Sequence, residues 1–274
     1  MQLGISSYTY GWNVGVSGNM PANVLTELDL VEKSRGFDIG ILQLGDNLPL
    51  HLFDKQRLEL FKNSLKQNNI QLEIGARGMT DEQLTGYIHL AADMGSGMLR
   101  FVIDDNHYEP SAHEIIRVIR SHTELLVSNK ITLALENHDR LKVAELAAII
   151  KEVNSEQVGI CLDTANSLGA GESIEAIVDA LAPYTVNLHL KDFGIQRLTH
   201  KMGFITSGRI AGEGMLNIPW LLQKIKSYQR CRTAILEQWV TPEDDIKSTV
   251  AKEEQWARKS VQYLKTIEAW EDPT

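Results

Sequence analysis

Eight short apolar segments, each followed by a longer stretch with helical periodicity, predict an α/β fold of one domain, the (β/α)8 or TIM barrel. The repeats follow one another through all 274 residues, and no change of composition or Pro/Ser-rich linker separates them. A barrel of eight such units takes about 250 residues. We therefore expect one barrel domain over residues 1–274.

The apolar segments have the short length and apolar character of parallel strands that are buried on both faces. The expected strands span residues 3–6, 39–44, 71–76, 98–103, 131–136, 158–163, 186–191 and 234–237. The alternative is an open sheet that binds a dinucleotide, which would need a GxGxxG turn after its first strand. The segment SYTYGWNVGVSG, which begins at Ser7, lacks this motif, so we expect no nucleotide cofactor.

The segments between the strands place apolar residues at the spacing of one helical face. Residues 112–119 are an example, with apolar side chains at the first, fourth, fifth and eighth positions. Another helix is expected to start after Thr80, because Gln83 three residues later resembles a capping box, and to end at Gly95. Helices of this kind would cover the outside of the barrel.

Composition and charge narrow the class of partner. The chain has 43% hydrophobic and 23% charged residues, a formal net charge of −9 and a pI near 5.4. An acidic protein does not offer the positive field that nucleic acids and anionic membranes require, so we expect a small-molecule partner. The sequence shows neither a signal peptide nor an apolar run of about 20 residues, which predicts a cytoplasmic protein. The oligomeric state stays open, a homo-oligomer included.

Ionisable residues stand at the ends of four consecutive strands: Glu136, Asp163, His189 and Glu237. In a (β/α)8 barrel these strand ends meet at the face that carries the active site. Three carboxylates brought together in a partly buried site repel one another strongly unless a cation lies between them. The pattern therefore predicts a divalent metal ion held by these residues.

The ligand set indicates the kind of metal. Three carboxylates and one imidazole suit Mn²⁺ or Mg²⁺, and the nitrogen favours Mn²⁺, Fe²⁺ or Co²⁺ over Mg²⁺. We take Mn²⁺ first and keep Mg²⁺, Co²⁺, Fe²⁺ and Zn²⁺ as alternatives. An octahedral ion with four protein ligands keeps about two positions for the neighbouring oxygens of a hydroxy-ketone. It would then acidify the adjacent C–H bond and stabilise an enediolate.

The motifs ALENHD, CLDTANS, LHLKDF and ILEQW, in this order, resemble the sugar phosphate isomerase/epimerase superfamily of xylose isomerase-like TIM barrels. The resemblance extends over essentially the whole chain. It implies one divalent metal bound by Glu136, Asp163, His189 and Glu237. In the ketose 3-epimerase branch, the first and last glutamates also form an acid/base pair, a role that would fall to Glu136 and Glu237. Those epimerases carry a His where this chain has Asn166, which speaks against a ketohexose substrate.

We therefore expect a metal-dependent isomerase or epimerase in carbohydrate metabolism, which acts on a sugar-like hydroxy-carbonyl compound by proton abstraction. A dehydratase or lyase of a sugar-like acid or keto-inositol is the second hypothesis, because it uses the same enolate. An AP endonuclease would need further metal ligands and a basic groove, which the charge of −9 opposes. A non-catalytic sugar- or metal-binding subunit comes last, because binding alone does not need two glutamates of this kind.

Four further residues are predicted to bind the substrate: His138, Asn166, Lys191 and Arg209. Lys191 follows His189 by two positions, so strand alternation points both side chains the same way. Arg209 precedes a Gly-x-Gly run, where members of the superfamily often place a substrate-binding arginine. It also lies in residues 192–217, a long connection of the kind that often forms a lid.

Overall fold

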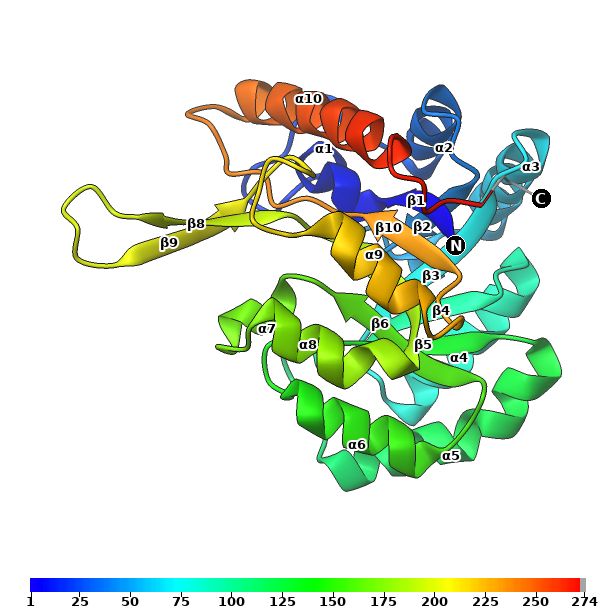
Figure 1. The fold of residues 1–274 in the computed structure, drawn as a ribbon. Coiled ribbons are helices and arrows are strands. Elements are labelled where there is room, and N and C mark those ends of the chain that lie inside the picture. Colours follow the sequence, from blue (N-terminus) through cyan, green and yellow to red (C-terminus); the bar gives the residue numbers. More distant parts are fainter. Residues whose placement is uncertain (272–274) are drawn as a thin grey trace.

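Eight parallel strands close into one barrel, so the fold class predicted from the sequence is confirmed (Figure 1). The structure is a computed structural model and describes residues 1–271. Around the barrel the strands follow the order β1-β10-β7-β6-β5-β4-β3-β2. The strands are β1 (Gln2–Ser6), β2 (Ile41–Leu44), β3 (Gln71–Arg77), β4 (Met98–Val102), β5 (Thr132–Glu136), β6 (Val158–Asp163), β7 (Thr185–Leu190) and β10 (Thr233–Leu236). Each expected strand is therefore present, with ends within two residues of the prediction.

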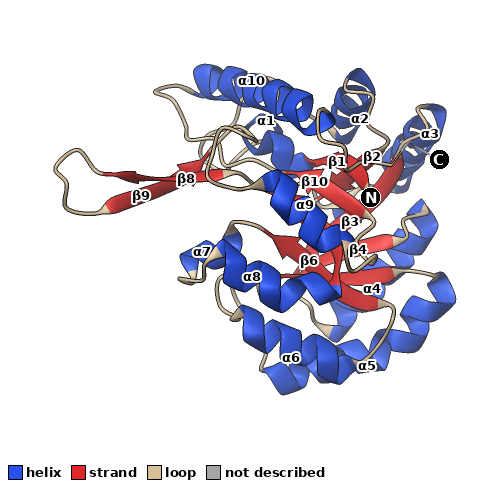
Figure 2. Ribbon diagram, in the orientation of Figure 1, coloured by secondary structure: helices blue, strands red, loops and turns tan. Residues whose placement is uncertain are grey.

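Helices surround the barrel on its outside (Figure 2). The main helices are α2 (Glu27–Gly36), α3 (Lys55–Gln67), α4 (Asp81–Met94), α5 (Ala112–Asn129), α6 (Val143–Val153), α8 (Ile174–Leu181), α9 (Ile218–Lys226) and α10 (Ile246–Lys265), and α1 (Gly11–Val14) and α7 (Asn166–Gly169) are single turns. Thr80 caps α4 by accepting the backbone N–H of Gln83 at 3.2 Å, and the left-handed Gly95 ends that helix with φ of 73°. None of the helices in residues 1–271 combines the length and the apolar character needed to cross a membrane.

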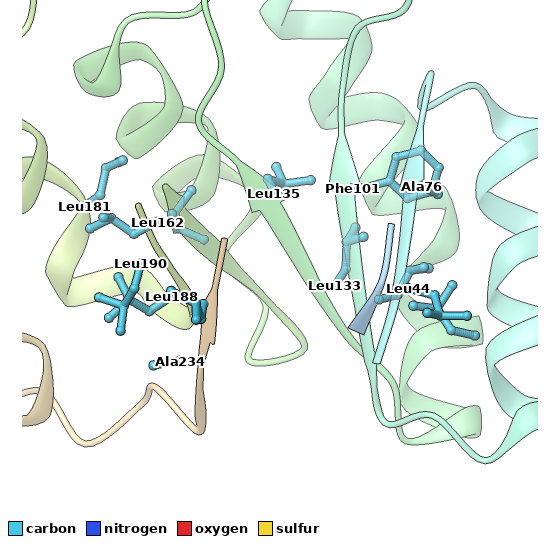
Figure 3. Packing of buried hydrophobic residues seen from close by; sticks show 14 of the residues in the cluster. Leu44, Ala76, Phe101, Leu133, Leu135, Leu162, Leu181, Leu188, Leu190 and Ala234 are labelled. Atoms are coloured by element: carbon cyan, nitrogen blue, oxygen red, sulfur yellow. The ribbon is translucent and has the colours of Figure 1, made fainter. Parts of the chain in front are cut away.

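The outward faces of the strands are apolar. Leu133 and Leu135 of β5 and Leu162 of β6 are fully buried, and Figure 3 shows them in the layer between strands and helices. Leu181 of α8 enters the same layer. Burial of a leucine side chain contributes roughly 1.5–3 kcal/mol. The main hydrophobic core is thus the shell between the barrel and its helices.

The inward faces of several strands are polar. Gln43, Glu73, Arg100, Asn187 and Thr233 are all buried, yet each lies on a strand whose neighbouring residues are apolar. Successive side chains of a strand point to opposite faces, so these residues face the barrel interior when their neighbours face the helices. The interior therefore holds a hydrogen-bonded polar layer below the open end of the barrel.

The connection after β7 differs from the expected loop. Residues 193–208 form an antiparallel hairpin of β8 (Phe193–Arg197) and β9 (Phe204–Gly208), which projects away from the barrel (Figure 1). Gly203 adopts φ of 122° and allows the chain to turn before β9. Regular pairing of Ile195 with Thr206 and of Arg197 with Phe204 gives this segment an extended form. A lid formed by residues 192–217 stays a prediction.

Candidate metal centre and active site

The four predicted ligand residues lie together at the carboxyl ends of adjacent strands. Glu136 and Asp163 are the last residues of β5 and β6, and Glu237 directly follows β10. His189 lies in β7 and pairs in register with Asp163. All four side chains are almost completely buried. The closed barrel thus gathers them although up to 101 positions separate them in sequence.

One atom from each of these side chains faces a common point. His189 Nδ1 lies 3.7 Å from Glu136 Oε2, 3.6 Å from Asp163 Oδ2 and 3.5 Å from Glu237 Oε2. All four atoms are buried and make no hydrogen bond of regular geometry. The three oxygens have only ion-pair contacts with Lys191 and Arg100. Asp163, His189 and Glu237 place ligand atoms within 4.8 Å of one another, and Glu136 joins His189 in a second such group with Cys161. Carboxylate and imidazole ligands gathered in this way fit a metal centre at His189.

The second oxygen of each carboxylate is anchored. Glu136 Oε1 accepts Asn166 Nδ2 at 2.8 Å, and Glu237 Oε1 accepts the Ser6 hydroxyl at 3.1 Å. Asp163 Oδ1 accepts the backbone N–H groups of Ala165 and Asn166 at 2.8 and 2.9 Å. Each carboxylate therefore has one fixed oxygen and one oxygen directed at the common point. Supporting bonds of this kind orient metal ligands before the ion binds.

The polar layer below the centre fixes the orientation of His189. His189 Nε2 lies 2.8 Å from Gln43 Oε1. The amide nitrogen of Gln43 donates to Glu73 Oε2 at 2.9 Å, which directs the Gln43 oxygen at the ring. His189 Nε2 therefore carries the proton, and Nδ1 keeps a lone pair for a metal.

Glu73 is in turn held from two other strands. It accepts Asn187 Nδ2 at 3.0 Å and the Thr233 hydroxyl at 2.6 Å. Burial raises the pKa of Glu73, and these hydrogen bonds offset part of that effect. The floor of the centre is thus one connected network that spans β2, β3, β7 and β10.

Two cations contact the carboxylates directly. Lys191 Nζ lies 2.7 Å from Asp163 Oδ2 and 3.0 Å from Glu237 Oε2. Arg100 contacts Glu136 Oε2 through Nε and Asp46 Oδ1 through Nη1, the latter at 2.9 Å. Burial lowers the pKa of Lys191, but the two carboxylates outweigh this effect and raise it well above its usual range. Lys191 and a bound metal ion would compete for the same two oxygens.

Two of the predicted substrate-binding residues, His138 and Arg209, make their polar contacts with other residues. His138 Nδ1 is 3.1 Å from Asp139 Oδ2, and its side chain is 30% exposed. Arg209 donates to the Ser207 hydroxyl and to the Gly208 carbonyl, both at 2.7 Å. Neither side chain forms an ion pair or hydrogen bond with the four ligand residues in the part of the chain that the structure describes. Their contact with substrate remains a prediction.

Arg100 and Gln43 were not predicted as site residues. Both interrupt apolar strands, in the segments MLRFVI and ILQL. A charged or amide side chain in the centre of a buried strand must find a polar partner, because burial without one is unfavourable. This signal was available in the sequence, although it does not say which partner is found.

A cleft of about 520 Å³ opens beside the metal centre. Trp12, Trp239 and Tyr8 contribute to its lining. Gln238 also lines it and directly follows Glu237, while the Tyr8 ring lies 5.9 Å from the Arg100 guanidinium. The cleft is therefore next to the candidate ligands and offers aromatic surface to a substrate.

The family profile described as xylose isomerase-like TIM barrel matches residues 29–267. The chain belongs to this family. The xylose isomerase-like barrel is 29% identical over 266 residues to 3-oxo-isoapionate decarboxylase of Pectobacterium atrosepticum, an alignment that covers 97% of this chain and 96% of the relative.

Solved structures of the xylose isomerase-like family share the same fold. D-psicose 3-epimerase, determined in the presence of D-fructose, has a TM-score of 0.70 at 15% identity and covers 97% of this chain and 98% of its own. A xylose isomerase-like TIM barrel protein from Mycobacterium smegmatis in complex with magnesium has a TM-score of 0.68 at 15% identity, with 96% and 97% covered. Relatives of this barrel thus include enzymes and a metal-binding protein.

Mn²⁺ should stabilise the native protein, because the four candidate ligand atoms come together only in the folded chain. At 100 times its dissociation constant, the ion should add about 2.7 kcal/mol to the free energy of unfolding. Differential scanning calorimetry of protein freed of metal with a chelator, measured with and without added Mn²⁺, gives this change. His189→Ala should abolish most of it, whereas Arg209→Ala, outside the cluster, should retain it. Indifference of wild-type melting to every divalent ion offered would contradict the assignment.

Gln43→Leu should weaken metal binding by about 10- to 100-fold, because His189 loses the acceptor that fixes its tautomer. Titration calorimetry with Mn²⁺ measures the dissociation constant. Thr233→Val is the matched control, since it removes a bond to Glu73 one step further from the ring and should have the smaller effect. Equal dissociation constants for wild type and Gln43→Leu would exclude this role of Gln43.

Proposed function

We propose that this chain is a divalent-metal-dependent lyase that removes carbon dioxide from a 3-oxo acid derived from a sugar. Glu136, Asp163, His189 and Glu237 hold the metal, with Mn²⁺ as the first candidate. Lys191 and Arg100 supply fixed positive charge beside it. The reaction belongs to the lyase class, which is the second hypothesis of the sequence analysis.

The observation that carries the proposal is that both glutamates are held by polar contacts. Glu136 is held between the Asn166 amide and Arg100, and Glu237 between the Ser6 hydroxyl and Lys191. Epimerisation by two bases needs a glutamate free to take a proton from carbon. Loss of carbon dioxide needs no such base, but it needs positive charge where an enolate forms.

The alignment with the decarboxylase supports the same reaction. It runs along 97% of this chain and 96% of the relative, so the barrel, the candidate centre and the loops are all included. That protein is named for a 3-oxo acid. A carbonyl at this position accepts the electrons released when the carboxylate carbon leaves.

In such a substrate the bond between the carboxylate carbon and its neighbour breaks. Carbon dioxide leaves, the electron pair of that bond enters an enolate, and the neighbouring carbon then takes one proton. No oxidant or reductant is required. When bound, a divalent metal supplies a Lewis acid for the ketone oxygen.

The side chains of the chain have separate tasks in this scheme. Lys191 carries its ammonium at the centre, stabilises the developing negative charge and is the candidate that returns the proton to carbon. Arg100 holds Glu136 in place through its contact with Oε2. Asn166 keeps the other oxygen of Glu136 engaged. Arg209 and His138 are assigned to the polar groups of the substrate.

An isomerase or epimerase is the second candidate function. The observation in its favour is that Glu136 Oε2 and Glu237 Oε2 both face His189 Nδ1, at 3.7 and 3.5 Å. Displacement of Arg100 and Lys191 would free both carboxylates to act as an acid/base pair. The substrate would then be a hydroxy-ketone that keeps all its carbon atoms.

Decarboxylation should be observed with 3-oxo sugar acids in the presence of Mn²⁺, because these substrates combine the leaving carboxylate with an electron-accepting ketone. Carbon dioxide release and NMR of the product in heavy water measure the reaction. One deuterium should appear at the carbon that carried the carboxylate.

Ketoses and keto-inositols serve as parallel substrates in this assay. Inversion of a centre with solvent deuterium and no gas would replace the decarboxylase by the epimerase. Loss of water would indicate the dehydratase. Binding of a sugar without any turnover would leave only a binding subunit.

Lys191→Met should lower turnover at least about 100-fold, because the proton-bearing cation is lost. It should also strengthen Mn²⁺ binding, since the Lys191 ammonium no longer competes for Asp163 and Glu237. Steady-state kinetics and metal titration on the same preparations separate the two effects. Lys191→Arg, which keeps the charge, should bind Mn²⁺ more weakly than Lys191→Met. A variant with weaker metal binding and normal turnover would contradict this role.

A further inference from the structure

Exposed apolar side chains gather on two segments of the surface. We call residues 193–208 the arm and residues 15–26 the entry loop. Met202 is 83% exposed and Phe204 61% exposed. The large exposed apolar residues of these two segments are Ile195, Met202, Phe204 and Ile205 of the arm and Val16, Met20 and Val24 of the entry loop. Scattered exposed apolar residues are ordinary, but a continuous group of them marks an interaction surface.

The two segments lie side by side at the base of the arm. Val16 of the entry loop and Ile205 of the arm line the same cleft. Met215, also exposed, contacts the arm near the same base, where its sulfur accepts the Ile195 backbone N–H at 3.3 Å. The apolar surface therefore continues from the entry loop along the arm.

The arm is a two-stranded sheet that stands by itself. β8 and β9 pair with each other, and within residues 1–271 no barrel strand extends this sheet. Figures 1 and 2 show it projecting well beyond the helices. An isolated two-stranded hairpin is at best marginally stable in water. An arm of this shape with apolar faces is stabilised when another surface covers it.

The charges of the molecule indicate which kind of surface can cover the arm. The tip of the arm carries Arg197, His200 and Lys201, and residues 193–212 contain no Asp or Glu. The whole chain, in contrast, has 27 Lys and Arg against 36 Asp and Glu. An exposed acidic run, residues 243–245, directly follows Thr241 and Pro242, which line the cleft at the base of the arm. One molecule thus has a basic tip and an acidic base.

We infer that two copies of this chain associate through their arms, with the tip of each arm on the acidic rim of the other copy's cleft. A two-fold axis makes every contact twice, so one surface must contain both complementary parts. Arms that run antiparallel satisfy this condition, because they bring tip to base at both ends. The apolar faces of the arms then cover each other and the entry loops.

In this arrangement the second copy also covers the cleft near the candidate metal centre. Trp12 and Trp239 line that cleft, and the acidic residues 243–245 directly follow Pro242, which also lines it. The arm of the second copy therefore closes a site that the arm of the same chain leaves open. The inference rests on the surface alone and does not depend on which reaction the centre catalyses.

Sedimentation analysis should give twice the 30.7 kDa chain mass for the wild-type protein. Phe204→Asp should convert it to a monomer, because a charge replaces an exposed aromatic ring at the proposed contact. Leu60→Asp, an exposed leucine on α3 far from the arm in sequence, is the matched control and should remain dimeric. A wild-type monomer, or a Phe204→Asp dimer, would overturn the inference.

A charge reversal tests the contact between tip and rim. Lys201→Glu and Asp244→Lys should each raise the dimer dissociation constant at least about tenfold, because each places like charges together. The double variant restores opposite charges across the interface and should bind more tightly than either single variant. Hydrogen exchange at residues 15–26 should rise on dilution as the dimer dissociates. A double variant no better than the singles, or exchange independent of concentration, would refute this contact.

Discussion

Three carboxylates buried at one point are the constraint on which the centre depends. Their free oxygens all lie within 3.7 Å of His189 Nδ1. Carboxylates gathered around one point in a protein interior repel one another strongly. The cations Lys191 and Arg100 contact these carboxylates and offset part of the repulsion. The proposed divalent ion would complete the balance. Because each carboxylate is anchored through its other oxygen, the charges cannot simply turn away from one another.

The barrel makes this arrangement possible by separating two interiors. The outward faces of the strands meet the helices in a dry layer of leucines, such as Leu133 and Leu162, which provides the hydrophobic stabilisation. The inward faces are then free to carry Gln43, Glu73 and Asn187, which bind one another. A polar network placed in the main hydrophobic core would lower the stability of the protein. Inside the barrel it orients His189, one of the candidate metal ligands.

The residues that follow Glu237 link the candidate centre to the cleft at the surface. Gln238 and Trp239 follow it directly and line the cleft, which the base of the arm also borders. A change at the base of the arm can therefore alter the shape of this cleft without changing any of the four candidate ligands. Proteins of one barrel family differ mainly in such connections beyond the strand ends, whereas the strands keep the centre in place.

The sequence by itself determined the barrel and the meeting of Glu136, Asp163, His189 and Glu237, because parallel strands in series must end at one face. Period-two alternation also placed Lys191 beside His189. Only the tertiary structure decided which partners the buried polar residues take, since Gln43 and His189 are 146 positions apart. It also decided that residues 193–208 project as an arm. Local pattern fixes the face that a side chain points to, but only the closed barrel brings distant strands into contact.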